Sequence, residues 1–270
     1  MIQIKSEAEI ATMREAGLVV AAALAAVREV VAPGLTTQDL DKVAEDVIRG
    51  AGAIPSFVGY HGFPATLCTS INDEIVHGIP SPKRVLKDGD LVSIDCGAIV
   101  GGYHGDSAIT VGVGTITHAQ AELLRVTEES MWRGFAAARL GGRVSDISHA
   151  VESYVRSQAH PTGGSWGIVE EYVGHGIGTE LHQDPQVQNF GRPGRGPKIE
   201  KGLVLAVEPM VNLGGRHTRQ LDDGWTVVTA DGSLSAHFEH TFTVTEDGPW
   251  VLTAEDGGRS RLEPLLAAAG

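Results

Sequence analysis

Cysteine is scarce in this chain, and its scarcity excludes two classes of site. Only Cys68 and Cys96 occur among the 270 residues. Two cysteines make no disulfide framework, and a metal site of the Cys-x-x-Cys type is excluded because no such pair is present. Reduced thiols are compatible with a reducing compartment, so we expect a cytoplasmic protein. A cysteine nucleophile stays open as an alternative, although Cys96 lies in an apolar segment that favours a core position.

The sequence also lacks long apolar runs and clusters of basic residues. Its longest apolar run, residues 18–27, is shorter than the roughly 20 residues that span a bilayer, and residues 1–15 do not resemble a signal peptide. We therefore expect no membrane association. The 21 Lys and Arg are outnumbered by 34 Asp and Glu, which gives a formal charge of −13. Because neutralising phosphates requires clustered cations, we expect no nucleic-acid partner.

No low-complexity linker divides the chain, and 270 residues can bury a sizeable core. We therefore expect a single catalytic domain that spans residues 1–270. A Gly-x-Ser-x-Gly sequence is missing, which argues against a serine nucleophile on a sharp strand-to-helix turn.

Apolar periodicity predicts a mixture of helices and strands. Capping-box patterns begin at Ser6 and Thr117, and a glycine pair at 101–102 predicts the turn of a hairpin. The expected helices cover residues 7–31, 37–50, 117–140 and 145–158, and the expected strands cover 65–75, 91–100, 103–113, 203–212, 225–230 and 236–246. This composition of elements predicts the α+β class.

A weak internal repeat relates the two ends of the chain. Gly34 and Gly141 each end a long predicted helix, and the second helix that follows starts similarly in both places, with Asp39-Leu40 and Asp146-Ile147. Chance similarity between amphipathic helices is one interpretation. The other is a duplicated α+β half, with halves of about 1–140 and 141–270 and a site between them.

Two aspartates in the predicted hairpin form the strongest candidate pair. The midpoint between Asp95 and Asp106 lies between Val100 and Gly101, so we expect the two residues to face one another, with Cβ atoms about 4.5–5.5 Å apart. Two opposed carboxylates are destabilising unless a cation lies between them. Both could instead be exposed strand residues or turn caps. However, the apolar run 91–94 predicts that Asp95 follows a buried strand, where a carboxylate needs a partner.

Three further residues extend this pair to a possible metal site. Glu208 ends an apolar strand before Pro209, Glu239 points away from the face that Phe238 shares, and His175 lies among glycines. Each alone could be an ordinary strand-end or loop residue. Together, four carboxylates and one imidazole suit two hard or borderline divalent ions, whose charge of +4 they balance. If the five converge, the chain is a two-metal hydrolase.

Short stretches of unusual sequence lie at and between these residues. They are 59–64 (GYHGFP), 68–72 (CTSIN), 76–80 (VHGIP), 95–106, 174–178 (GHGIG) with His182, 208–210 (EPM) and 238–241 (FEHT). Together they resemble the type I (bacterial) methionine aminopeptidases, over about residues 4–250. The resemblance implies the pita-bread fold, an α+β architecture with two pseudo-twofold-related halves, a central antiparallel sheet and outer helices.

The resemblance also implies an activity and a metal centre. The activity is removal of the initiator methionine from nascent proteins when the second residue is small, with a metal-activated water that attacks the scissile carbonyl. Two divalent ions would be held by Asp95, Asp106, His175, Glu208 and Glu239. Mn²⁺, Fe²⁺, Co²⁺ and Zn²⁺ all suit such ligands, so the metal stays open.

Further roles follow from the same resemblance. His77, His182 and Glu208 would be catalytic: His77 at the scissile nitrogen, His182 at the oxyanion, and Glu208 as a proton carrier. The substrate methionine would contact Tyr60, Phe63, Cys68, His77, His182 and Trp225. Phe57 and Leu181 replace residue types that are commoner at those positions, at the rim of the pocket.

The expected partner is the N-terminal methionine of nascent polypeptides, with the ribosome as a further candidate, and we expect a monomer. Two alternatives share the fold. A prolidase or proline-type aminopeptidase usually carries an extra N-terminal domain, for which this chain has no room. A catalytically inactive binding module typically loses metal ligands, whereas all five are present here.

Overall fold

The computed structural model describes residues 1–268 of the chain. Its helices are α1 (Glu7–Val30), α2 (Thr37–Gly50), α3 (His118–Ala137), α4 (Val144–Ser157), α5 (Arg259–Ala267) and the short 3₁₀ helix η1 (Tyr60–Gly62). The strands are β1 (Ile54–Pro55), β2 (Leu67–Ile71), β3 (Glu74–Val76), β4 (Leu91–Val100), β5 (Tyr103–Gly112), β6 (Gly167–Ile168), β7 (Gly174–Gly176), β8 (Gln183–Val187), β9 (Val204–Val207), β10 (Met210–Asn212), β11 (Thr218–Gln220), β12 (Val227–Thr229), β13 (Ser235–His237), β14 (Glu239–Thr245) and β15 (Gly248–Val251).

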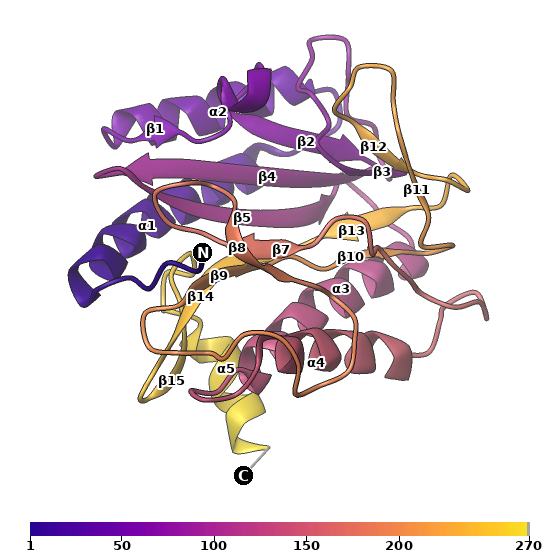
Figure 1. Cartoon of the computed structure of the whole chain (residues 1–270). Coiled ribbons are helices and arrows are strands. Elements are labelled where there is room, and N and C mark those ends of the chain that lie inside the picture. The colour runs from indigo at the N-terminus through magenta and orange to yellow at the C-terminus, as the bar shows by residue number, and fades with distance from the viewer. Residues whose placement is uncertain (269–270) are drawn as a thin grey trace.

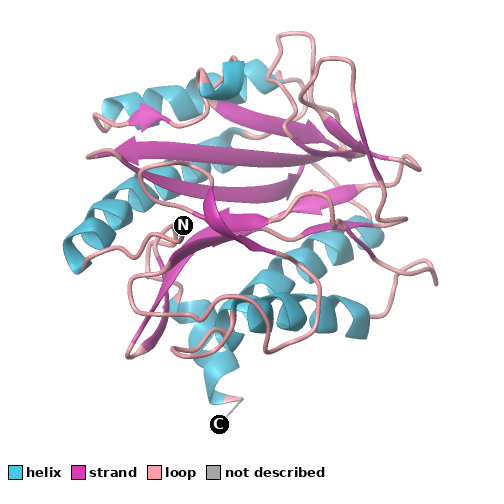
Figure 2. Ribbon diagram, viewed as in Figure 1, coloured by secondary structure: helices cyan, strands magenta, loops and turns pink. Residues whose placement is uncertain are grey.

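A nine-stranded antiparallel sheet forms the centre of the molecule, in the order β1-β4-β5-β14-β9-β7-β8, with β2 also paired to β4 and β15 to β14. Two small sheets, β13-β10-β6 and β11-β12-β3, adjoin it. Figure 1 shows α1 and α2 beside the β4–β5 hairpin and α3 and α4 beside β10, β13 and β14. Helices therefore lie on the outside and strands in the middle, as Figure 2 shows by colour.

The long first helix is a core helix. Its capping box is the one predicted, with the Ser6 side chain accepting from the Glu9 amide and Glu9 accepting from the Ser6 amide. By length and composition alone α1 could cross a membrane. Its residues Met13, Val20 and Val27 are instead fully buried, and the helix packs on β4 and β5. This burial explains its apolar composition.

Each pair of long helices covers its own apolar cluster. Under α1 and α2, Leu24 and Leu40 pack with Ile94 of β4. Under α3 and α4, Phe135 packs on Phe242 of β14 with ring centroids 4.7 Å apart. Both helix pairs therefore pack on the same continuous sheet. The ends of its central strands lie between the two layers that these helix pairs form. Duplication of an α+β half remains our interpretation of the sequence repeat.

The register of the β4–β5 hairpin corrects one prediction. Gly101 and Gly102 form a two-residue turn, so Val100 pairs with Tyr103, Asp95 with Ala108, and Gly97 with Asp106. The expectation that Asp95 and Asp106 lie directly opposite is therefore wrong, because it placed the midpoint one residue too early. The two aspartates are diagonal neighbours on the same face of the hairpin, since residues two apart on a strand share a face.

Two expected strands are each broken, and both breaks lie at candidate ligands. The segment 203–212 divides into β9 and β10 around Glu208 and Pro209, and 236–246 divides into β13 and β14 at Phe238. Pro209 has no amide hydrogen to continue a ladder. Of the four pieces, β9 and β14 pair in the large sheet, whereas β10 and β13 pair in a small one. Glu208 and Glu239 therefore lie where the chain passes between sheets.

Candidate metal centre

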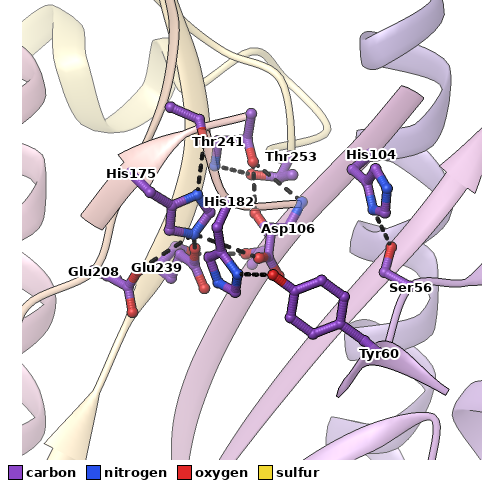
Figure 3. A network of polar contacts seen from close by, with 12 residues as sticks. Ser56, Tyr60, His104, Asp106, His175, His182, Glu208, Glu239, Thr241 and Thr253 are labelled. Atoms are coloured by element: carbon purple, nitrogen blue, oxygen red, sulfur yellow. Dashed lines mark hydrogen bonds and ion pairs between the residues drawn. The ribbon is translucent and has the colours of Figure 1, made fainter. Parts of the chain in front are cut away.

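Five side chains from distant parts of the sequence converge on one cavity of about 310 Å³. They are the five ligands proposed from sequence: Asp95 on β4, Asp106 on β5, His175 on β7, Glu208 after β9 and Glu239 at the start of β14. Figure 3 shows four of them, Asp106, His175, Glu208 and Glu239, pointing toward one another from separate segments of the chain. The cavity also holds every other residue to which the sequence assigned a role: Tyr60, Phe63, Cys68, His77, His182 and Trp225.

Strand alternation fixes which side chains face the cavity. Asp106 and Glu239 point into it, and the next residues, Ser107 and His240, point to the other side of the sheet. Ser107 Oγ donates to the Glu239 carbonyl oxygen at 2.6 Å. Thr241 Oγ1 donates to the Asp106 carbonyl oxygen at 2.8 Å and accepts from the Asp106 amide at 3.1 Å. These bonds tie β5 to β14 at the two ligands.

The imidazole of His175 is held in the tautomer that a metal requires. Its Nδ1 donates to the carbonyl oxygen of Gly176 at 3.0 Å, which leaves a lone pair on Nε2. Burial lowers the pKa of His175 to about 3, so the ring is neutral at pH 7. Nε2 lies 3.5 Å from Glu208 Oε1 and 3.8 Å from oxygens of both Asp106 and Glu239. A lone pair aimed at three carboxylates is repulsive unless a proton or a metal cation lies between them.

The carboxyl groups show the same need for a cation. Asp95 Oδ1, Asp106 Oδ1 and Glu239 Oε1 are buried and have no hydrogen-bond partner among the described residues. Burial, together with the other carboxyl groups, raises the pKa of Asp106 and of Glu239 well above the ordinary range. Oxygen-rich donors with one neutral imidazole fit a hard or borderline divalent ion. The residues present therefore fit a divalent metal site.

These shifts predict how the metal-free protein responds to pH. Burial raises the pKa of Asp95 to about 7 and of Glu208 to about 8, so the folded state keeps protons that the unfolded chain releases near pH 4. Stability from such groups is lost as pH rises through the folded pKa, by up to about 1.4 kcal/mol per pH unit for each proton retained. Buried histidines with lowered pKa values, such as His77 at about 4, have the opposite effect, so that stability rises with pH. This effect is confined to pH values below about 6.5.

We therefore expect the melting temperature of the EDTA-stripped protein to fall between pH 6.5 and 8. Thermal denaturation followed by circular dichroism measures this. Saturating Mn²⁺ should remove the fall, because the metal replaces the protons. Burial lowers the pKa of Lys5 to about 8. This shift makes stability rise with pH, but only above pH 8, so the expected fall in melting temperature ends there. A metal-free protein that becomes more stable across the window contradicts the assignment.

One end of the cavity is apolar and aromatic. Phe63 lies edge-on to Trp225 with ring centroids 5.0 Å apart and edge-on to Phe57 at 6.5 Å. Leu181 and Cys68 complete this wall. Burial and the neighbouring carboxyl groups raise the pKa of both Cys68 and Cys96 well above that of a free thiol. Neither is therefore an activated nucleophile, which disfavours the cysteine alternative.

Two histidines lie between the apolar wall and the carboxyl groups. Tyr60 Oη is 2.6 Å from His182 Nδ1, and the His182 ring lies edge-on to His175 with centroids 4.3 Å apart. His77 adopts a left-handed backbone conformation, with φ of 63°, and packs edge-on to Trp225 and Tyr172. Burial lowers the pKa of His77 and of His182, so both rings are neutral near pH 7.

The sequence analysis missed two histidines near the cavity. His61 lines it, and buried His237 lies behind Glu208, with Nε2 3.5 Å from Glu208 Oε2. A signal for His237 was available, because it precedes Glu239 by two residues in one predicted strand and such residues share a face. His61 lies in a loop with φ of 47°, for which no periodicity exists to read.

Comparison with known proteins places this arrangement in a family. The profile of metallopeptidase family M24 matches residues 11–246. A methionine aminopeptidase 1 of Mycobacterium tuberculosis is 55% identical over 249 residues, which cover 92% of this chain and 94% of that protein. A methionine aminopeptidase of Clostridium acetobutylicum is 51% identical over 253 residues, covering 94% and 99%.

Solved structures give the same result at the level of the fold. The crystal structure of a methionine aminopeptidase from Thermotoga maritima matches with a TM-score of 0.90 at 43% identity, covering 94% of this chain and all of that one. A prolidase from Pyrococcus furiosus matches with a TM-score of 0.72 at 22% identity, covering 93% of this chain and 65% of that one. The second likeness concerns the fold alone.

Proposed function

This chain belongs to metallopeptidase family M24, and from that premise we propose how its cavity removes an N-terminal methionine. It has the pita-bread fold, and it is a metal-dependent aminopeptidase that acts on N-terminal methionine. The proposal concerns the roles of the individual residues, the number of ions and the choice of substrate. One observation carries it: four carboxyl groups and a neutral imidazole meet at the edge of an apolar aromatic wall.

Two ions are the number that the charges favour. Four carboxylates carry a charge of −4, which two divalent cations balance. Among the proposed ligands, carboxyl oxygens of Glu239 lie within 4.8 Å of donor atoms of Asp106 and His175 and of a donor atom of Glu208, so this residue is close to both ends of the ligand set. The metal itself is Mn²⁺, Fe²⁺, Co²⁺ or Zn²⁺, and availability decides among them.

The ligands we propose are Asp95, Asp106, His175, Glu208 and Glu239. When bound there, divalent ions polarise the scissile carbonyl and make water a nucleophile at neutral pH. The substrate's free α-amine lies at the carboxyl groups, which makes the enzyme an exopeptidase. Glu208, at the edge of the ligand set, would also carry the proton from the attacking water to the leaving amine nitrogen.

His182 would stabilise the negative charge that develops on the carbonyl oxygen. The Tyr60 hydroxyl lies 2.6 Å from Nδ1 of this ring. We propose that the hydroxyl donates to Nδ1, which would place the imidazole proton on Nε2, free to donate to the substrate. His77, held between Trp225 and Tyr172, contacts the scissile amide nitrogen. Both roles need neutral rings, which burial provides.

The apolar wall selects the methionine side chain. Tyr60, Phe63 and Trp225 offer ring edges and faces to an unbranched thioether, and each sulfur–aromatic contact contributes about 0.3–1.5 kcal/mol. Phe57 and Leu181 add bulk to the same wall. We propose that the second residue of the substrate must be small.

We propose that the enzyme works as a monomer in the cytoplasm on nascent chains, with the ribosome as its place of encounter. The substrate supports this, since initiator methionines are exposed as chains are made. The chain-wide charge of −13 gives no general attraction to ribosomal RNA.

Peptide hydrolysis tests the proposal directly. We expect EDTA-stripped protein to cleave Met-Ala-Ser only after Mn²⁺ or Co²⁺ is added, and to leave Xaa-Pro peptides intact. Met-Leu-Ser, with a bulky second residue, is the matched control and should react far more slowly. Preferential cleavage of Xaa-Pro peptides would favour a prolidase, and inactivity on all three with metal present would favour a binding module.

A further inference from the structure

His237 is a buried imidazole to which the mechanism above gives no task. Its exposed fraction is 1%, and its Nε2 has no hydrogen-bond partner among the described residues. A buried polar atom without a partner costs about 1–3 kcal/mol, so such an atom near an active site calls for a reason. The nearest acceptor is Glu208, with Nε2 3.5 Å from Oε2.

The backbone around His237 is rigid, so the ring cannot easily move away from Glu208. The His237 amide donates to Thr110 Oγ1 at 2.8 Å, and the same hydroxyl donates back to the His237 carbonyl oxygen at 2.7 Å. On the other side, β13 pairs with β10, which begins directly after Glu208 and Pro209, and His237 is opposite Met210. The imidazole and the carboxyl group are therefore fixed relative to each other by two neighbouring strands.

Glu208 has one imidazole at each carboxyl oxygen. Oε1 faces Nε2 of His175 at 3.5 Å, and Oε2 faces Nε2 of His237 at 3.5 Å. The two imidazoles differ, because His175 lines the cavity and His237 lies outside its lining. The Nδ1–H of His175 is bound to the Gly176 carbonyl oxygen, so its Nε2 can only accept, whereas Nε2 of His237 has no hydrogen-bond partner within the described part of the chain and is open to donate.

We propose that His237 is a positioning residue, which donates from Nε2 to Glu208 Oε2 and so holds the other carboxyl oxygen toward the cavity. The gap of 3.5 Å requires a shift of about half an ångström to reach hydrogen-bond length, which rotation of the carboxyl group supplies. A carboxylate that both binds metal and carries a proton must keep one orientation, and hydrogen bonds from behind commonly fix such ligands. This inference rests on the proposed function of Glu208.

Substitution of His237 by Leu and by Gln tests the inference. Leu removes the donor while keeping an apolar side chain of moderate volume, and Gln keeps an N–H donor of similar reach. We expect His237→Leu to weaken Mn²⁺ binding to the stripped protein by about 10- to 100-fold in calorimetry, as loss of an outer partner does. It should also lower kcat on Met-Ala-Ser with little change in KM. His237→Gln should restore both to within a few-fold of the unsubstituted protein.

His240→Leu is the matched control. It removes a half-buried imidazole three residues further along the chain that faces the other side of the sheet, where Nδ1 bonds to Thr253 Oγ1 at 2.8 Å. We expect it to lower the melting temperature and to leave Mn²⁺ affinity unchanged. Should His237→Leu not fold, His237→Asn replaces it, because the shorter amide cannot reach Glu208, and the same loss is expected against His237→Gln.

Several outcomes overturn the inference. Unchanged metal affinity and kcat in His237→Leu would show that Glu208 needs no support. Equal losses in the Leu and Gln variants would make His237 a direct metal ligand instead, since an amide is a poor replacement for a metal-bound imidazole. Failure of the proposed function is a separate result: unsubstituted protein that neither binds Mn²⁺ nor cleaves Met-Ala-Ser refutes that function whatever the variants do.

Discussion

Glu239→Gln is expected to abolish peptidase activity and to prevent the protein from binding its full complement of metal. The substitution keeps the size of the side chain and removes one negative charge from a residue whose carboxyl oxygens lie within 4.8 Å of donor atoms of Asp106, His175 and Glu208. Its Oε1 is buried, has no hydrogen-bond partner among the described residues and lies 3.8 Å from His175 Nε2. Calorimetric titration with Mn²⁺ and hydrolysis of Met-Ala-Ser measure the two losses.

The stability of this variant separates a metal effect from misfolding. In EDTA the variant should melt no lower than the unsubstituted protein, because a neutral amide replaces a buried carboxyl group whose pKa is strongly raised. With Mn²⁺ the unsubstituted protein should gain stability and the variant should not. Glu180→Gln is the matched control, because Glu180 is exposed and lines a surface pocket together with His175 and His182. It should behave as the unsubstituted protein does. Full activity in Glu239→Gln would remove the residue from the centre.

His182→Ala is expected to lower kcat by about 10²–10³-fold, the usual effect of removing one donor to an oxyanion. Because His182 is not one of the five proposed ligands, the Mn²⁺ affinity of the variant should stay within about threefold of that of the unsubstituted protein. A difference of this size corresponds to the loss of one weak contact. Steady-state kinetics on Met-Ala-Ser and calorimetry distinguish the two properties. A His182→Ala enzyme with normal kcat would show that the oxyanion is stabilised elsewhere.

Tyr60→Phe refines this expectation. The variant keeps the aromatic ring at the methionine pocket and loses only the hydroxyl that is 2.6 Å from His182 Nδ1. Removal of one hydrogen bond is worth about 0.5–1.5 kcal/mol, so we expect kcat to fall by about tenfold or less. The KM for methionine peptides should change little, because the ring that contacts the side chain remains. A large rise in KM with unchanged kcat would assign Tyr60 to binding alone.

The residues of the cavity could be predicted from the sequence because their contexts are unusual. Asp95 follows a buried apolar strand and His175 lies among glycines, and both sit beside stretches that resemble one family. Strand period alone predicted that Glu239 and Phe238 face opposite sides, and Phe238 indeed packs in the apolar cluster under α3 and α4 while Glu239 lines the cavity. These inferences needed only local pattern.

Register and strand breaks could not be predicted in the same way. The prediction that Asp95 and Asp106 lie directly opposite one another was wrong. Gly101 and Gly102 form a two-residue turn, and this turn places Asp106 opposite Gly97. The breaks at Glu208 and Phe238 depend on two strands that leave one sheet for another, which is a tertiary event. Strand period could have placed His237 on the face of Glu239, but its contact with Glu208 depends on the pairing of β10 with β13, which the sequence does not specify.

The tight turn at Gly101 and Gly102 has a consequence for how this enzyme can vary. Both glycines have positive φ, 55° and 84°, and both are exposed at the edge of the molecule, far along the hairpin from the cavity. Inserting a single residue within the paired part of β5 would reverse the facing of every later side chain on that strand. Asp106 would then turn toward the helices and Ser107 toward the substrate. The number of residues between this turn and Asp106 is therefore constrained as strictly as the identity of any acid that the hairpin directs into the cavity.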